Sequence, residues 1–184
     1  MKKWAISLFL LLFLTGCTGS TELERGMALR SSLLKSSGSF DAKITADYGD
    51  KCHVFTVSCI FDDQGNLGFT VQEPEEIAGI TGNIRSDGGE LTFDDTVLYF
   101  PLLADGQLSP VSAPWIFMKA LRSGYLTAAG MEDELLRLSI DDRYEADALH
   151  LDIWLEEQDI PVRGEILYGN RRILSIDVSN FLIS

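Results

Sequence analysis

Residues 40–71 of the chain decide the fold, and they read FDAKITADYGDKCHVFTVSCIFDDQGNLGFTV. Apolar and polar residues alternate from Phe40 to Tyr48, which is the period of an antiparallel strand with one buried face. Gly49-Asp50 then forms a two-residue turn with glycine first, as a tight hairpin requires. The turn fixes the register and places apolar residues opposite one another: Phe40 with Cys59, Ala42 with Val57, and Ile44 with Phe55.

The next turn leads to the same apolar face. If Asp63-Gln64-Gly65 is a three-residue loop with Gly65 in the left-handed conformation, a third strand pairs with the second. Two independent turns therefore predict three strands that share one apolar side. The pairs expected across the second turn are Phe61 with Leu67, Cys59 with Phe69, and Val57 with Val71.

The rest of the chain extends this sheet and adds two helices. Helical spacing over Glu22–Lys35 comes before the first strand, and the segment Trp115–Leu126 is apolar nearly all round its first turn, as in a helix buried on several sides. The sequence predicts an α+β fold, a curved antiparallel sheet with an N-terminal and a central helix. The further strands are expected at Ile80–Arg85, Glu90–Phe93, Val97–Phe100, Glu134–Ile140, Ala148–Glu156, Ile160–Tyr168 and Arg171–Val178.

Composition limits the classes of function. The chain has 184 residues, 46% of them hydrophobic and 23% charged, which suits one globular domain. Its formal net charge of -13 repels phosphate backbones and anionic lipid surfaces. We therefore expect no nucleic-acid partner, and we expect any attachment to a membrane to depend on an anchor.

The N-terminus carries such an anchor signal. Two lysines precede an apolar stretch, Trp4–Leu14, that is too short to cross a bilayer, which needs about 20 residues. The following Leu14-Thr15-Gly16-Cys17 resembles the lipobox of bacterial lipoproteins. The resemblance implies a cleaved signal at 1–16, acyl chains on Cys17, a tether at 17–24, a domain at 25–184 and an extracytoplasmic location on a membrane.

The order of elements resembles the lipoprotein-carrier fold of LolA and LolB and the related LppX-type and Firmicute envelope lipoproteins. The opening helix, the meander Phe40–Phe100 and the helix Trp115–Leu126 carry the resemblance. It implies a half-barrel with helices plugging its concave face and an acyl-binding space between sheet and plug. The alternative is that the aromatic residues simply fill a core. The expected lining is Phe55, Phe69, Trp115, Met118 and Trp154.

The residues capable of chemistry are few. Cys52 and Cys59 lie seven positions apart on one strand, roughly 23 Å, whereas a disulfide needs less than about 7 Å. We expect two free thiols, with Cys59 buried. His53 is expected on the apolar face at the core or the cavity edge, and His150 in solvent. No motif for a metal, a cofactor or a nucleophile–base pair occurs, so the chain is expected not to be an enzyme.

Two functions remain open. In the first, the half-barrel binds an acyl chain or another apolar ligand, which requires a pocket of several hundred Å³. In the second, the chain is an interaction or scaffold lipoprotein of an envelope complex, for example one serving spore germination, as a monomer or a dimer. The second function predicts an exposed sheet edge or apolar patch.

Overall fold

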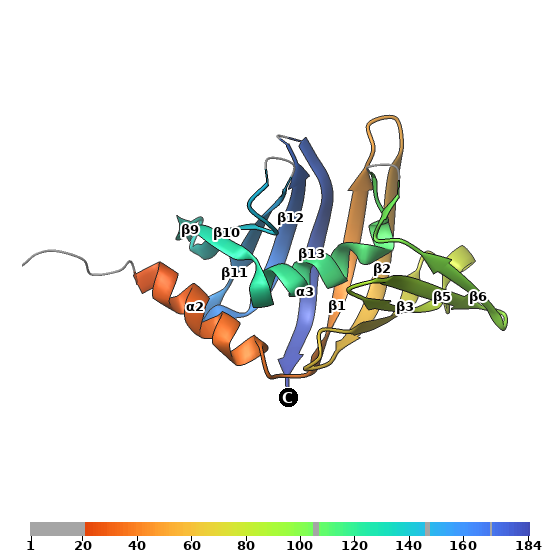
Figure 1. Cartoon of the computed structure of the whole chain (residues 1–184), viewed down its shortest axis with the longest axis horizontal. Helices are drawn as coiled ribbons and strands as arrows, with labels where there is room; N and C mark the ends of the chain where they lie inside the picture. Colours follow the sequence, from red (N-terminus) through yellow and green to blue (C-terminus); the bar gives the residue numbers. More distant parts are fainter. Residues whose placement is uncertain (1–20, 105–106, 146–147, 170) are drawn as a thin grey trace, which may run out of the picture.

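The computed structural model describes residues 21–104, 107–145, 148–169 and 171–184 (Figure 1). The signal at 1–16, the lipidation site Cys17 and the start of the tether lie outside the described residues. Within the described ranges, the helices are too short or too polar to cross a membrane. The helix α2 (Thr21–Leu33) begins within the segment 17–24 that was expected to be the tether. Glu22 and Glu24 favour this start because acidic side chains stabilise the first turn of a helix.

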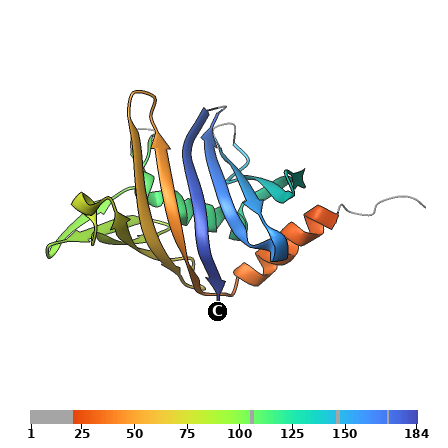
Figure 2. The ribbon, with the colours of Figure 1, turned by 180° about the vertical axis from the view of Figure 1, so that it is seen from behind.

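One antiparallel sheet of eleven strands dominates the described residues, and it curves strongly (Figures 1 and 2). The strand order is β6-β5-β4-β3-β2-β1-β13-β12-β11-β10-β9. The strands are β1 (Gly38–Asp47), β2 (Cys52–Phe61), β3 (Leu67–Glu73), β4 (Thr81–Arg85), β5 (Gly88–Phe93), β6 (Thr96–Phe100), β9 (Tyr125–Glu132), β10 (Leu135–Asp141), β11 (Leu149–Leu155), β12 (Pro161–Tyr168) and β13 (Arg171–Ile183).

The predicted registers are confirmed. Phe40 faces Cys59 and Ile44 faces Phe55 across β1 and β2, and Cys59 faces Phe69 across β2 and β3. Gly49 and Gly65 adopt the left-handed backbone that the turns require, with φ of 94° and 86°. Local turn geometry therefore sets the pairing of the first three strands.

Two features of the sheet were not predicted. Strand β9 directly follows the central helix, and its sequence YLTAAGME has little strand character. Strand β13 runs on to Ile183 and pairs with β1, which joins the first six strands to the last five. This pairing joins residues more than a hundred positions apart, so no local pattern indicates it.

Both helices cover the concave face (Figure 1). The central helix α3 (Ala113–Ser123) lies across the sheet and ends where Gly124 turns into β9, shorter than the expected Trp115–Leu126. The segment before it contains the two-strand pair β7 (Leu103–Ala104) and β8 (Gln107–Leu108). Short 3₁₀ turns occur at η2 (Glu75–Ile77), η3 (Pro110–Ser112) and η4 (Glu157–Asp159).

Glycines let the helices approach the sheet. A Cβ atom on Gly164 of β12 would lie 2.7 Å from the ring of Phe117, the innermost aromatic residue of α3. A Cβ on Gly26 of α2 would lie 2.9 Å from Leu138 of β10. The expected half-barrel with an N-terminal helix and a plugging helix is thus the fold of the chain.

Candidate functional site

Four of the five residues expected to line a cavity lie together on the concave side. Phe55, Phe69, Trp115 and Met118 belong to one continuous buried cluster, in which each is at most 7% exposed. Around them the helix α3 contributes seven further buried residues. The space between the sheet and α3 is therefore largely filled by side chains.

Trp154 lies on the opposite face, which corrects the expectation that it lines the concave side. Leu151, Ile153 and Leu155 of β11 point into the core, and alternation turns Trp154 to the convex surface. It is nevertheless only 7% exposed, because the guanidinium groups of Arg137 and Arg163 lie 5.5 Å and 4.5 Å from its ring. Long basic side chains thus shield an aromatic ring at the surface.

A small apolar crevice remains beside α3. Its volume is about 80 Å³, well below that of a typical ligand pocket of roughly 300–1,000 Å³. The Trp115 indole N–H donates a hydrogen bond of 2.9 Å to the Gly65 carbonyl, which fixes one wall. The crevice is lined by Leu102, Leu108, Trp115, Ile116, Lys119, Ala120, Ser123, Gly124, Asp142 and Leu149.

The sheet extends past the helices at one end. We call β4, β5 and β6 the flap; it projects beyond α3 in Figure 1. Leu98 of β6 pairs with Leu91, and Leu91 pairs with Gly82, which faces the core residue Phe69. Directly opposite residues share a face, so Leu98 continues the concave apolar side of the sheet. Yet Leu98 is 61% exposed, and neither α2 nor α3 extends over the flap in Figure 1.

Further apolar side chains surround Leu98 in the flap. Phe93 lies on the same face and is half exposed, and Val97 and Tyr99 project from the other face with 47% and 76% exposure. The sequence predicted a strand here, but its exposure was missed. One signal was available, because Val97–Phe100 is apolar at every position and therefore lacks the alternation of a strand with one solvated face.

The convex face carries a tight polar cluster between β10 and β11. Asp152 is 5% exposed and accepts two hydrogen bonds from Arg137, of 3.0 and 2.7 Å, and one of 2.7 Å from Ser139. Burial by itself raises the pKa of Asp152, but the hydrogen bonds from Arg137 and Ser139 and the charges of Arg137 and His150 outweigh it and keep that pKa below its ordinary range. His150, expected in solvent, is half-buried, with Nδ1 2.7 Å from Asp141 Oδ1. These groups satisfy one another and tie the strands together.

A second cluster on the same face has the same character. Burial raises the pKa of Glu165, whereas hydrogen bonds from Arg163 and Arg172 lower it more strongly, so the net pKa lies below the ordinary value. Arg172 donates at 2.9 Å, and Arg163 is also bonded to this carboxylate. Asp152 and Glu165 are thus both paired with arginine side chains that lower the pKa of the carboxyl group.

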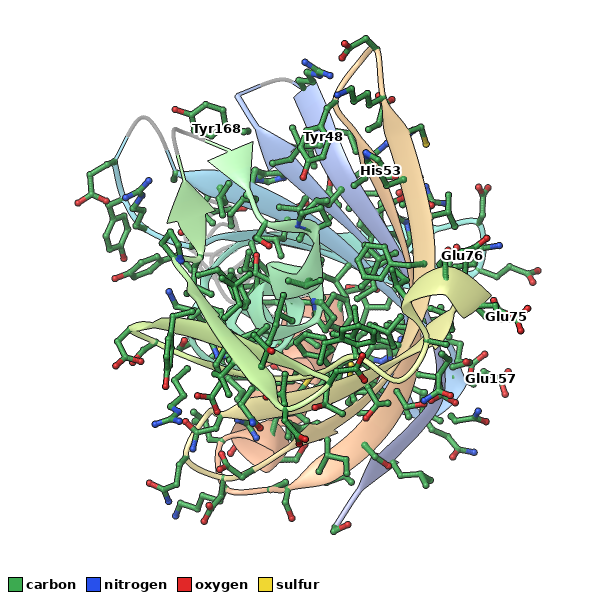
Figure 3. The ribbon with its side chains drawn as sticks, turned by 90° about the vertical axis from the view of Figure 1, so that its right-hand side faces the viewer. Tyr48, His53, Glu75, Glu76, Glu157 and Tyr168 are labelled. Carbon is green, nitrogen blue, oxygen red and sulfur yellow. The ribbon has the colours of Figure 1, made fainter. Side chains whose placement is uncertain are left out.

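The remaining candidate chemical groups lie apart from one another. Cys52 and Cys59 are free, as expected, and burial raises the pKa of the Cys59 thiol far above its ordinary value. His53 is exposed near the rim of the sheet, close to Tyr48 in Figure 3, so its expected place at the core or cavity edge is wrong. It is the second residue of β2, and the first three residues of this strand are all exposed. Among the residues that the structure describes, no three metal-ligating side chains converge.

No protein-family model and no curated protein matches the chain. Solved structures resemble it in fold. A LolA superfamily protein from Nitrosomonas europaea is 10% identical with a TM-score of 0.49, over 89% of this chain and 93% of that chain. The lipoprotein LppX of Mycobacterium tuberculosis is 11% identical with a TM-score of 0.38, over 87% and 92%. A structure of the CwlD amidase from Clostridioides difficile in complex with the GerS lipoprotein is 12% identical with a TM-score of 0.41, over 90% and 96%.

With TM-scores below 0.5 and identities of 10–12%, these likenesses concern the fold alone. Three features of the chain itself bear on function: the filled concave side, the small crevice beside α3 and the exposed flap.

Proposed function

We propose that the chain is a lipid-anchored extracytoplasmic lipoprotein that binds a protein partner of the cell envelope through its flap and catalyses no reaction. One observation carries this proposal. The apolar concave face continues beyond α3 onto Leu98 and Phe93, which are 61% and 50% exposed. Large apolar side chains gathered on one exposed surface are typical of protein interaction sites. An envelope complex that serves spore germination is one setting that the proposal covers.

The position of the flap suits an anchored protein. Cys17 precedes the first residue of α2, Thr21, by four residues, which span at most about 14 Å. The start of α2 and the flap lie at opposite ends of the long axis of the molecule (Figures 1 and 2). An anchor on Cys17 would keep the α2 end close to the membrane and leave the flap accessible to a partner.

Site-specific crosslinking in cells tests the interaction. A photoreactive amino acid at Leu98 should form a crosslinked adduct with one protein partner. The matched control is Ile60 of β2, which is even more exposed at 70% but lies on the convex face, four strands from β6. Equal adducts at both positions, or none at position 98, would contradict the proposal.

The anchor has its own test. Cells fed an alkyne-bearing fatty acid should label the wild-type protein and not the Cys17→Ala variant, which should leave the membrane fraction. Equal labelling of both proteins would show that Cys17 carries no acyl chain. This result would leave the crosslinking test unaffected.

A second candidate function is the binding of an apolar ligand in the crevice beside α3. Its apolar lining and the Lys119 ammonium, which lies 5.2 Å from the centre of the Trp115 ring, would suit a chain with an anionic head. Native mass spectrometry of the purified lipoprotein should then show a bound lipid, lost when Ala120→Leu fills the crevice. A protein without added mass in both forms would exclude this function.

A further inference from the structure

The two edges of the sheet differ in their surroundings. Strand β9 forms one edge, and α2 packs beside it. A Cβ atom added to Gly26 of α2 would lie 3.3 Å from the side chain of Leu126 in β9. Strand β6 forms the other edge, and in the part of the chain that the structure describes no element pairs with its outer side. The main-chain groups on that side therefore face solvent, and such groups are a template for another strand.

The turn before β6 identifies which main-chain groups these are. Asp94 and Asp95 have φ of 44° and 61°, the left-handed pair of a type I′ two-residue hairpin that ends in the pair Phe93 and Thr96. In such a hairpin the closing pair exchanges both hydrogen bonds, and bonded pairs then alternate along the ladder. Leu98 and Phe100 accordingly bond to β5, whereas the N–H and C=O groups of Val97 and Tyr99 point outward.

Strand β6 lacks most of the features that protect edge strands. Its sequence Thr96–Phe100, TVLYF, contains no lysine, no proline and no charge, and four of its five side chains are exposed. Pro101, directly after the strand, is the next position whose main chain would face outward, and proline has no N–H to donate. The free edge is thus short, extended and apolar.

Charge indicates what kind of segment fits this edge. The acidic pair Asp94-Asp95 lies at the start of β6, and Glu90 lies opposite Tyr99. A shallow hollow of about 400 Å³ beside the strand contains Asp87 and Glu90 with the single basic side chain Arg85. A basic segment would be attracted here, whereas a second copy of the chain would bring another net charge of -13.

We propose that β6 takes up an extended segment of a partner protein as an added strand, and that this segment alternates apolar residues and carries basic residues at its ends. Main-chain bonds to Val97 and Tyr99 supply the pairing, and Leu98 and Tyr99 contact alternate side chains on the two faces. This inference rests on the proposed function, because it names the chemistry of the partner at the same flap.

Substitution at Val97 separates main-chain pairing from side-chain contact. Val97→Pro removes an outward N–H and leaves the bonds of Thr96, Leu98 and Phe100 to β5 in place. Val97→Ala shortens the same side chain and keeps the N–H. Tyr99→Pro and Tyr99→Ala form a second pair in case Val97→Pro disturbs the flap, and circular dichroism with urea unfolding checks the fold of each variant.

The probe is a synthetic peptide of alternating valine and threonine with two lysines at each end, added to the full lipoprotein in detergent. We expect binding by fluorescence anisotropy and slower hydrogen exchange at the Val97 and Tyr99 amides. The proline variants should weaken binding about tenfold, the equivalent of one main-chain hydrogen bond. Val97→Ala should change binding less than twofold, and Tyr99→Ala should weaken it less than Tyr99→Pro does. A peptide with glutamates in place of lysines should bind more weakly, and added salt should reduce that difference.

The results separate strand addition at β6 from the more general proposal that a partner binds the flap. Failure of the lysine peptide to bind or to protect the two amides overturns strand addition. A crosslink from position 98 that persists in Val97→Pro also overturns strand addition, and leaves the proposed function standing. Loss of that crosslink in Val97→Pro supports strand addition. A dimer that dissociates in Val97→Pro would show that the occupant is a second copy, which contradicts the basic partner.

Discussion

Replacing Gly164 by alanine should destabilise the fold, because the plugging helix touches the sheet at this glycine. The added Cβ would lie 2.7 and 2.8 Å from two ring carbons of Phe117 and 2.9 Å from Ile176 Cγ2. Ordinary contacts begin near 3.4 Å, and Phe117 is fully buried, so its ring has no free space into which to move. Overpacking of this kind costs about 1–3 kcal/mol, and we expect Gly164→Ala to lower the free energy of unfolding by that amount.

Urea unfolding followed by tryptophan fluorescence measures the effect, with an unchanged dependence on urea concentration as the sign of an intact native state. Gly130→Ala is the matched control, since nothing lies within 4 Å of its Cβ position, and it should change stability by less than about 0.5 kcal/mol. Adding Phe117→Leu to Gly164→Ala should cost less than the sum of the single changes, because the two sites touch. Equal stability of Gly164→Ala and Gly130→Ala, or strict additivity of the pair, would refute the reasoning.

Three further predictions concern the convex face, the thiols and α3. The pKa values of Asp152 and Glu165 are held below their ordinary values, so their contribution to stability is present above about pH 4 and lost as the pH falls through the lowered pKa. Asp152→Asn should therefore reduce the loss of unfolding free energy between neutral and acid pH. An unchanged loss would contradict this. A thiol reagent should modify the exposed Cys52 in the native protein and the buried Cys59 only after unfolding, and equal rates would show that the core opens readily. Arg122 is buried, lies over the Phe61 ring and donates a hydrogen bond of 2.6 Å to the Ser36 carbonyl. Arg122→Ala should therefore lower the free energy of unfolding in urea by about 1.5–3 kcal/mol. An unchanged free energy of unfolding would show that this contact is dispensable.

The hairpins could be predicted because each depends on adjacent residues. Gly49 and Gly65 fix two turns, and alternation on either side of them fixes which side chains are buried. The same alternation, applied consistently along β11, would have placed Trp154 on the convex face. The burial of this ring comes from arginines on β10 and β12, and its sequence neighbours do not reveal them.

Strand β9 could not be predicted in the same way. The run from Tyr125 to Glu132 contains two alanines and a glycine, and it is a strand because β10 pairs with it and α2 packs beside it. Likewise, the exposure of Leu98 depends on where α3 begins, because the helix does not extend over the flap in Figure 1. His53 shares the face of its partner Ala46, but the first is exposed and the second is fully buried. Pattern gives the face of a residue, whereas neighbouring elements decide whether that face is covered.

The sequence by itself determined the periods, the turns and the registers of the first three strands, because these depend on steric preferences within a few residues. The tertiary structure alone decided that β1 pairs with β13, that Phe117 of α3 fills the concave side against Gly164, and that β6 is left uncovered at the end of the sheet. The physical reason is that burial is a property of surfaces brought together from distant parts of the chain. A strand with apolar residues on both faces is therefore a core strand or a binding edge according to what packs against it.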